Sequence, residues 1–427
     1  MKLPSVPVGI HTLIHEGLVQ ARLPFTCCIN LWNQDRIQVI GTTDSSLSLV
    51  LQIQHPGIIR AVLLQRDLLV FVDTYLNGLF DFSGSLDSLI LLFRHLASIQ
   101  ISANQQLRAW LEAWTLPALP SGELVTAQPY QVARSPKHDR ASIQYHYDVG
   151  NDFYQHWLDP QLVYTCAHYD SADMSLAEAQ TAKLDLICRK LRLQPGETLL
   201  DAGCGWGALL RWAVKHYGVT GYGITLSAEQ VAFNHQQIEA EGMGDRLQVE
   251  LRDYRELPQQ PTFDKAVAIG IIEHIGRKNY PVYFNHIMSV LKPGGLFLNH
   301  GINATRDGHG NTIGERFINR YIFPNGELVR LSTTVTAMED AGWEIVDVDA
   351  WRPHYAMTLR HWIANFDQAI AELAGLIGDR QVQLWRLYLI GSALAFEHNH
   401  TGLYQILLRK QSDRHWNLPL TRPGWLC

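Results

Sequence analysis

An acidic residue and three glycines occur together in one short segment, at Asp201, Gly203, Gly205 and Gly207. The apolar residues before Asp201 predict the end of a buried strand, and residues 208–214 predict a helix. A strand that turns on glycines into a helix lets a ligand approach the backbone and directs the helix N-terminus toward it. Because a carboxylate at the strand end accepts hydrogen bonds from a cationic amine, the segment suits S-adenosylmethionine, whose amino-acid end carries an ammonium and a carboxylate.

The same segment also satisfies part of the fingerprint of dinucleotide-binding folds, with Gly203, Gly205 and Ala208 in the key positions. That fingerprint requires an acidic residue about twenty positions later, which holds a ribose hydroxyl. Residues 223–225 occupy this place and contain no acid. The pattern therefore favours the methyl donor over a nicotinamide cofactor, and a purely structural strand–turn–helix is the remaining interpretation.

Strands and helices alternate from Gly196 onward, which predicts an α/β fold with a doubly wound, mostly parallel sheet. The predicted strands end near residues 200, 225, 251, 270 and 300. Ligands of such sheets bind at the carboxyl ends of the strands. Candidate residues follow these ends, namely Asp201, Gly203, Thr225, Asp253, Tyr254, Glu273 and His300.

Other elements are predicted from local patterns. Ser227 is expected to cap the helix 227–240, with Gln230 completing a capping box. Residues 301–340 are predicted as an inserted lid. The remaining expected elements are a strand at 344–349, helices at 357–377 and 381–396, and a closing strand at 402–408.

The chain is long enough for two or more domains. Residues 1–104 are expected to form a smaller α+β domain, with strands at 47–53 and 68–72 and a helix that opens at Ser85. Residues 105–140 are predicted as a linker, 141–410 as the catalytic domain and 411–427 as a tail. A short basic cluster at residues 134–140 fits either a solvated linker or a contact with anionic lipid headgroups.

Composition excludes several classes of protein. The net charge of -6 among 427 residues gives no support for a nucleic-acid binder. Six cysteines without a regular framework predict reduced thiols and a cytoplasmic location. The chain contains no apolar run of about eighteen residues, as a membrane span requires, and its first residues lack the long apolar stretch expected of a signal peptide.

Several segments together resemble the cyclopropane-fatty-acyl-phospholipid synthases and the related mycolic acid cyclopropane synthases. The most specific are residues 164–167 around Cys166, the pair Glu273–His274, and the aromatic segment 321–326. The other matching segments are residues 145–152, 200–207, 223–227, 253–255, 279–280 and 354–355. The resemblance covers about residues 140–410, and the first domain more weakly resembles the accessory lipid-handling domain of the phospholipid-using branch.

The resemblance implies a class I, Rossmann-like methyltransferase that forms a cyclopropane ring on the cis double bond of an unsaturated phospholipid acyl chain. The alkene attacks the methyl group of S-adenosylmethionine, and the resulting carbocation loses a proton to a bound bicarbonate and closes. The residues that would hold bicarbonate are Cys166, Glu273, His300, the backbone of Ile302, and Tyr355. The residues that would contact the methyl donor are Tyr164, Thr165, Asp201, Gly203, Cys204, Gly205, Gly207, Thr225, Gln230, Asp253 and Tyr254, and no metal is expected.

Alternative functions remain open at this point. One alternative lies within the same class of acyl-chain methyltransferases. Such an enzyme would methylate the acyl chain without ring closure and leave a methylene- or methyl-branched product. Methylation of a polar small molecule, a non-enzymatic lipid-binding protein and a nicotinamide oxidoreductase are further alternatives. The expected partners are unsaturated membrane phospholipids, reached by peripheral contact with the inner face of the membrane, and, by analogy with the family, a second copy of the chain.

Overall fold

The computed structural model describes residues 4–42, 44–65, 67–119, 150–306, 312–323 and 326–422, and the chain divides into two compact units. The N-terminal unit comprises Met1–Tyr130, Gly310–Tyr321 and Gly378–Gly391, and the larger unit comprises Gln131–His309, Ile322–Ile377 and Ser392–Cys427. The domain boundaries at residues 104, 140 and 410 stay a prediction. The basic cluster at 134–140 and residues 145–149 of the matching segment 145–152 lie outside the described residues.

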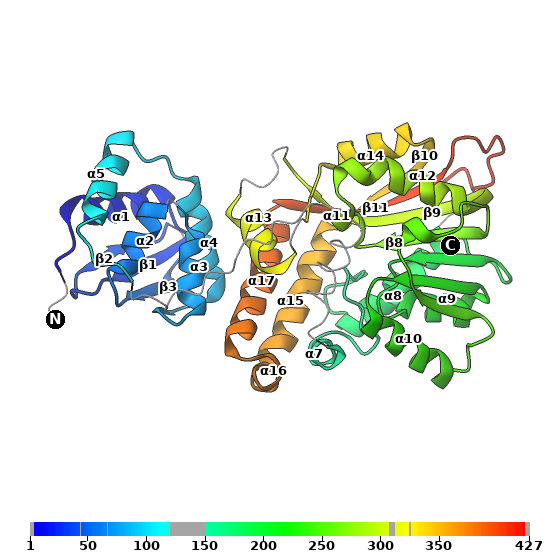
Figure 1. Ribbon diagram of the computed structural model, residues 1–427, viewed down its shortest axis with the longest axis horizontal. Helices are drawn as coiled ribbons and strands as arrows, with labels where there is room; N and C mark the ends of the chain where they lie inside the picture. Colours follow the sequence, from blue (N-terminus) through cyan, green and yellow to red (C-terminus); the bar gives the residue numbers. More distant parts are fainter. Residues whose placement is uncertain are drawn as a thin grey trace. The chain divides into compact units, whose positions relative to one another are not determined.

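The larger unit is built on a seven-stranded sheet with the strand order β10-β11-β9-β8-β5-β6-β7 (Figure 1). Its strands are β5 (Thr198–Ala202), β6 (Thr220–Thr225), β7 (Leu247–Leu251), β8 (Phe263–Ile269), β9 (Leu291–Ala304), β10 (Trp343–Ala350) and β11 (Thr401–Lys410). Strands β5 to β9 pair in parallel, whereas β11 is antiparallel to both β9 and β10. This topology confirms the predicted mostly parallel, doubly wound sheet, in which the strand order reverses beside β5.

Helices cover both faces of this sheet (Figure 1). On one face lie α8 (Leu176–Lys190), α9 (Ala208–Tyr217) and α10 (Ala228–Ala240), and on the other α11 (Ile272–Ile275), α12 (Tyr280–Val290) and α14 (Leu331–Asp340). Successive residues of β5 enter different cores, since Leu199 packs on the α8–α9 side and Leu200 on the α12 side. The unit also contains α7 (Asn151–Gln155), α15 (Arg352–Gln368), α16 (Ile370–Ile377) and the end of α17 (Asp379–Glu397).

Two predictions for the larger unit need correction. Ser227 does accept a hydrogen bond from the backbone N–H of Gln230 at 3.3 Å. However, the Gln230 side chain accepts from the hydroxyl of Thr225 at 2.6 Å, so the reciprocal bond of a capping box is replaced by a contact with β6. The prediction of a lid is wrong for residues 331–340, because they form α14 and bury Thr334 and Met338 against the sheet.

The N-terminal unit contains a four-stranded sheet with the order β2-β1-β3-β4. Its elements are α1 (Val8–Ala21), β1 (Phe25–Asn30), β2 (Arg36–Val39), β3 (Asp44–Ile53), α2 (Gly57–Gln65), α3 (Leu69–Leu76), β4 (Phe80–Ser83), α4 (Leu86–Ser98), α5 (Ala103–Ala113), α13 (Ile313–Phe317), most of a π-helical turn (Ile318–Ile322) and most of α17 (Asp379–Glu397). Strands β1 and β3 pair in parallel and the other pairs are antiparallel. The expected smaller α+β fold is confirmed.

The prediction of a strand at residues 68–72 is wrong, because residues 69–72 lie in α3 and Leu68 directly precedes it. Asp67 accepts a hydrogen bond from the backbone N–H of Leu69 at 2.9 Å and so satisfies a donor at the start of the helix. A short apolar run fits a buried strand and a buried helix equally well, so its periodicity could not distinguish the two kinds of element. The helix expected at Ser85 is confirmed, since the Ser85 side chain accepts from the N–H of Ser88.

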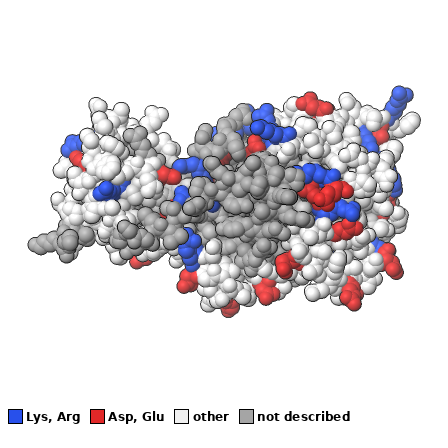
Figure 2. All heavy atoms as spheres, viewed as in Figure 1, with Lys and Arg blue, Asp and Glu red and all other residues white. Residues whose placement is uncertain are grey.

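Charges of both signs are interspersed on the described part of the face shown in Figure 2. Among the described residues, none of the helices is by itself both long and apolar enough to cross a bilayer. In the part of the chain that the structure describes, the pair α4 and α5 meets those two criteria when taken together, and the two helices are bent by 119° relative to one another.

A buried acid on α3 joins distant parts of the N-terminal unit. Asp73 is 1% exposed, and its Oδ2 lies 3.0 Å from the guanidinium of Arg320. Its Oδ1 accepts a hydrogen bond from the hydroxyl of Tyr321 at 2.8 Å. Arg316 pairs with Asp67 in the same way at 3.0 Å. These contacts hold residues 316–321 against α3 and the turn before it.

We expect Asp73→Ala to lower the free energy of unfolding of this unit by about 3 kcal/mol, because it removes a buried carboxylate that accepts hydrogen bonds from the guanidinium of Arg320 and the hydroxyl of Tyr321. Denaturant unfolding monitored by circular dichroism measures the change. Asp81→Ala removes an exposed acid from β4 and should change the free energy of unfolding by less than about 0.5 kcal/mol. Equal effects of the two substitutions would contradict a structural role for the Asp73 contacts.

Candidate active site

The glycine segment forms the turn between β5 and α9, as predicted. Gly203 has a φ of +98° and Gly207 a φ of +74°, which other residues rarely adopt. A Cβ atom at Gly203 would lie 2.1 Å from Cδ1 of Ile271, and one at Gly207 would lie 1.8 Å from Oδ1 of Asn234. Asn234 is itself fixed, because its amide donates to the carbonyl of Gly205 at 2.9 Å. Positions 203 and 207 of the turn are therefore packed so closely that only glycine fits at each.

Asp201 lies at the carboxyl end of β5 and is 3% exposed. Its Oδ1 is buried and has no hydrogen-bond partner in the described part of the chain. Burial raises the pKa of this carboxyl from 3.8 to about 7, against the opposing effect of the Lys183 ammonium. A cationic amine beside Oδ1 would stabilise the carboxylate, so the site fits the ammonium of S-adenosylmethionine.

The other predicted donor residues lie at the ends of the two neighbouring strands. Thr225 ends β6, and the N–H of Cys204 donates to the carbonyl of Ile224 at 3.0 Å, which joins the glycine turn to this strand. Asp253 and Tyr254 follow β7. Both oxygens of the Asp253 carboxylate accept from Arg255, at 2.8 and 2.6 Å, and this guanidinium also lies over the ring of Tyr254.

The segment that contains Tyr164 and Thr165 packs against α8. The hydroxyl of Thr165 accepts a hydrogen bond from Nζ of Lys183 at 3.0 Å, and its carbonyl accepts from the amide of Gln180 at 2.8 Å. The ring of Tyr164 lies 5.4 Å from that of Tyr154. These contacts place the segment beside α7, the helix that carries Tyr154.

Helix α7 covers the glycine turn. The ring of Tyr154 lies 4.9 Å from that of Trp206, which belongs to the turn. The indole N–H of Trp206 donates to Oδ1 of Asn151 at 2.8 Å. Helix α7 therefore lies over the predicted donor site.

Lys183 is a functional candidate that the sequence analysis missed. It is 1% exposed, and burial lowers its pKa to about 8, while the nearby Asp159, Cys166 and Asp201 raise it. Lys183 thus supplies a positive charge beneath both the predicted donor residues and Cys166. A signal was present, since Gln180, Lys183, Ile187 and Lys190 recur at helical spacing and form one buried face of α8.

Glu273 follows β8 and lies on α11. Its Oε1 accepts a hydrogen bond from the backbone N–H of Ile302 at 2.6 Å, and its Oε2 is buried without a partner among the described residues. Burial raises the pKa of Glu273 from 4.5 to about 7, against the lowering effect of the Ile302 N–H. The amide of Ile302, predicted to hold bicarbonate, thus contacts Glu273 in this structure.

Trp351 contacts Cys166, the ring of His300 and the backbone of Tyr355. Its carbonyl accepts a hydrogen bond from the N–H of Tyr355 at 3.2 Å and lies 4.0 Å from Sγ of Cys166. Its ring centroid lies 5.3 Å from that of His300. Burial raises the pKa of the Cys166 thiol, which is therefore neutral and donates to the carbonyl of Ala167 at 3.2 Å.

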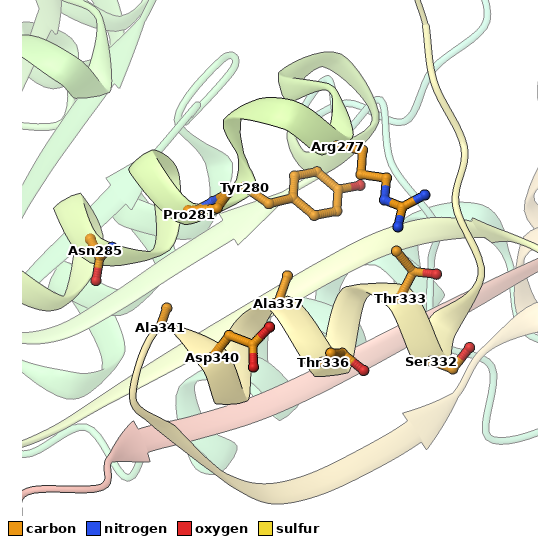
Figure 3. A pocket seen from close by; sticks show the side chains of 10 residues that line it. All are labelled: Arg277, Tyr280, Pro281, Asn285, Ser332, Thr333, Thr336, Ala337, Asp340 and Ala341. Carbon is orange, nitrogen blue, oxygen red and sulfur yellow. The ribbon is translucent and has the colours of Figure 1, made fainter.

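A groove of about 400 Å³ lies between α12 and α14. Arg277 and Tyr280 line one side, and Thr333, Thr336 and Asp340 lie along α14 on the other (Figure 3). None of the predicted site residues lines this groove. Among the described residues, no three His, Cys, Asp or Glu side chains are placed to hold a metal ion.

The fold and the glycine turn define the class of protein. Cyclopropane synthase MmaA2 from Mycobacterium tuberculosis superposes with a TM-score of 0.61 at 32% identity, over 64% of this chain and 98% of that chain. Mycolic acid cyclopropane synthase CmaA1 complexed with SAH and CTAB gives the same values. The chain is an S-adenosylmethionine-dependent methyltransferase with an α/β fold. Residues 134–406 match the model of the mycolic acid cyclopropane synthetase family, and the chain belongs to this family.

Curated relatives share the larger part of the chain. A probable fatty acid methyltransferase from Pseudomonas putida is 44% identical over 298 residues, which are 69% of this chain and 75% of the relative. The cyclopropane-fatty-acyl-phospholipid synthase of Escherichia coli (strain K12) is 37% identical over 271 residues, which are 62% of this chain and 66% of that protein.

We expect Gly207→Ala to weaken binding of S-adenosylmethionine by at least about tenfold, because the added methyl group displaces Asn234 and the positive φ is strained. Isothermal titration calorimetry measures the change. Gly196→Ala is the matched control, since Gly196 also has a positive φ, of +83°, but no atom within 4 Å of the added group. The control should lose stability and keep its affinity, and equal losses of affinity would contradict the assignment.

We expect Glu273→Gln to change how stability depends on pH. Between its unfolded pKa near 4.5 and its folded pKa of about 7, the unfolded chain has released the Glu273 proton while the folded protein keeps it. Raising the pH over this window therefore destabilises the wild type relative to the variant, by up to about 3 kcal/mol.

Urea unfolding of both proteins from about pH 5 to about pH 8 measures this difference. The similar contribution of Asp201 is present in both proteins and cancels. Glu256→Gln, at an exposed position, should give the same pH dependence as the wild type. A constant difference between wild type and Glu273→Gln across this range would show that the Glu273 carboxyl is not held neutral by burial.

Proposed function

We propose that this methyltransferase transfers a methylene group from S-adenosylmethionine to the cis double bond of unsaturated phospholipid acyl chains and forms a cyclopropane ring. The observation that carries the proposal is a pair of buried polar atoms without partners among the described residues, Oε2 of Glu273 and Nε2 of His300. Identity of 37% with the cyclopropane-fatty-acyl-phospholipid synthase of Escherichia coli supports the substrate class.

The donor would be held at the carboxyl ends of β5, β6 and β7. When bound, S-adenosylmethionine supplies the methyl group. Asp201 would accept from its ammonium, and the turn from Gly203 to Gly207 would lie against it. The other proposed donor contacts are Tyr164, Thr165, Cys204, Gly205, Thr225, Gln230, Asp253 and Tyr254.

Ring closure requires a base that takes a proton from the transferred methyl group, and we assign this role to bicarbonate. Cys166, Glu273, His300, Ile302 and Tyr355 would hold the anion. The raised pKa of Glu273, caused by burial, supports this assignment, because a protonated carboxyl donates a hydrogen bond to an anion where a carboxylate would repel it. His300 would supply a second donor through Nε2.

The aromatic side chains beside Tyr164 suit a reaction with a cationic intermediate. The rings of Trp157 and Trp362 lie 5.3 and 5.2 Å from that of Tyr164, and both tryptophans are 1% exposed or less. Such a cluster excludes water from a carbocation on the acyl chain, and aromatic faces attract positive charge.

A second candidate is methylation of the acyl chain without ring closure. Two relatives with higher identity, from Pseudomonas putida at 44% and Mycobacterium tuberculosis at 43%, are named as probable fatty acid methyltransferases. In this case the carbocation would lose a different proton and give a methylene-branched chain, and a methyl-branched chain would require a separate hydride donor to reduce that product. The structure of the product decides between the two.

We also propose that the protein reaches its substrate at the surface of a membrane. Because phospholipid acyl chains reside in bilayers, the protein would contact the inner face of the membrane peripherally from the cytoplasm. A homodimer would allow one subunit to stay attached while the other reacts.

We expect vesicles of a monounsaturated phospholipid to acquire label from methyl-labelled S-adenosylmethionine, with a mass gain of one methylene and loss of the double bond. Vesicles of the saturated phospholipid should stay unlabelled. Proton NMR of the product separates a ring from a branched chain.

Glu273→Gln and His300→Asn should each reduce the rate by about 100-fold, because both residues hold the base. Asn285→Ala, in the groove between α12 and α14, should keep the wild-type rate. Unlabelled lipid after incubation with a folded, donor-binding wild type would refute the proposed function.

A further inference from the structure

A row of polar side chains crosses three neighbouring strands of the larger unit. Asp349 on β10 lies directly opposite Gln405 on β11, and Gln405 lies directly opposite His300 on β9. Gln405 and His300 are 1% and 2% exposed. Because the backbone pairing fixes these positions, the side chains contact one another in a defined order.

Lys190 of α8 fixes the orientation of the Gln405 amide. Its Nζ lies 2.7 Å from Oε1 of Gln405 and 2.7 Å from Oδ2 of Asp349. The indole N–H of Trp351 donates to the same oxygen of Asp349 at 2.9 Å, which holds the carboxylate in place. An ammonium can only donate hydrogen bonds, so the oxygen of the Gln405 amide must face Lys190 and its nitrogen must face away.

The nitrogen of that amide faces His300. Nε2 of Gln405 lies 3.0 Å from Nδ1 of His300. An amide NH₂ group is a donor only, so Nδ1 must accept and carries no proton. Burial, together with the cations of Lys183 and Lys190, lowers the pKa of His300 well below its ordinary value, so the ring is neutral. A neutral imidazole without a proton on Nδ1 has its proton on Nε2.

We propose that Lys190 and Gln405 are positioning residues that hold His300 in the neutral tautomer with its proton on Nε2. Nε2 is buried and has no partner among the described residues, so its N–H is available to an anion in the active site. The inference rests on the proposed function in one respect, because it assigns the hydrogen-bonding state of a residue of that same site. Lys190 and Gln405 act only through His300.

The tautomer can be observed directly by NMR of protein labelled with ¹⁵N-histidine. The signals of His300 are identified by their disappearance in His300→Asn. The wild type should show a protonated Nε2 and an unprotonated Nδ1. A His300 ring protonated on Nδ1, or on both nitrogens, would overturn the inference whatever the activity of the enzyme.

Substitution of Gln405 tests the cause of the tautomer. In Gln405→Glu the carboxylate only accepts hydrogen bonds, so the proton should move to Nδ1. The kcat for methyl transfer should then fall by about 10- to 100-fold, with an unchanged KM for S-adenosylmethionine. Gln405→Met removes both donor and acceptor at similar volume, and it should give a mixture of the two tautomers. If both variants keep the wild-type tautomer, Gln405 does not position His300.

Lys265→Met is the matched control for loss of a buried lysine. Lys265 pairs with Glu197 at 3.5 Å and lies near the start of β8, at the opposite end of the sheet from His300. This variant should keep both the His300 tautomer and the rate, whereas Lys190→Met should lose the single tautomer. If the wild type shows the expected tautomer but does not methylate lipid, the proposed function fails and the assignment of the His300 state stands.

Discussion

Burial of ionisable side chains is the constraint on which the active site depends. A charge enclosed by protein without a partner is unfavourable by several kcal/mol, so each such group must be compensated or neutral. Lys183 meets this requirement through the hydroxyl of Thr165 and the nearby acids Asp159 and Asp201. Glu273 meets it through a raised pKa, which results from burial. The site therefore contains buried polar atoms without partners among the described residues, such as Oδ1 of Asp201 and Oε2 of Glu273, which suit ligands of complementary hydrogen-bonding character.

The two halves of the seven-stranded sheet carry different groups of candidate site residues. The parallel half, from β5 to β7, ends in the glycine turn and the residues that suit a methyl donor. The other half begins at β8 and β9 and continues into antiparallel β11 and β10. Because β11 runs between β9 and β10, Gln405 faces a histidine on one side and an acid on the other. Gln405 on the antiparallel strand β11 thereby controls the tautomer of His300 on the neighbouring strand β9.

The N-terminal unit includes residues from late in the sequence. The segments Gly310–Tyr321 and Gly378–Gly391 belong to it although the chain before and after them belongs to the larger unit. Asp73 holds the first of these segments through Arg320 and Tyr321. Tyr321 begins the segment 321–326 that resembles the family in sequence, and the hydrogen bond from its hydroxyl to Asp73 fixes this end of the segment.

Local signals in the sequence determined the glycine turn, the alternation of strands and helices, and the caps at Ser85 and Ser227. Each of these features depends on residues within a few positions of one another, so it can be predicted without knowledge of the fold. The predicted positions of Glu273 and His300 near strand ends rested on the same alternation together with the family resemblance. The roles assigned to individual site residues stay predictions.

Tertiary structure alone decided which groups meet. His300 and Gln405 are 105 residues apart, and Lys190 lies 215 residues before Gln405, so no local pattern could pair them. The helix at residues 69–76 and the side chain of Gln230 likewise follow from packing that overrides an ambiguous local pattern. The sequence by itself determined the types of residue available for chemistry. Their protonation states and hydrogen-bond partners were decided only by the fold, because burial and cross-strand pairing are properties of the assembled chain.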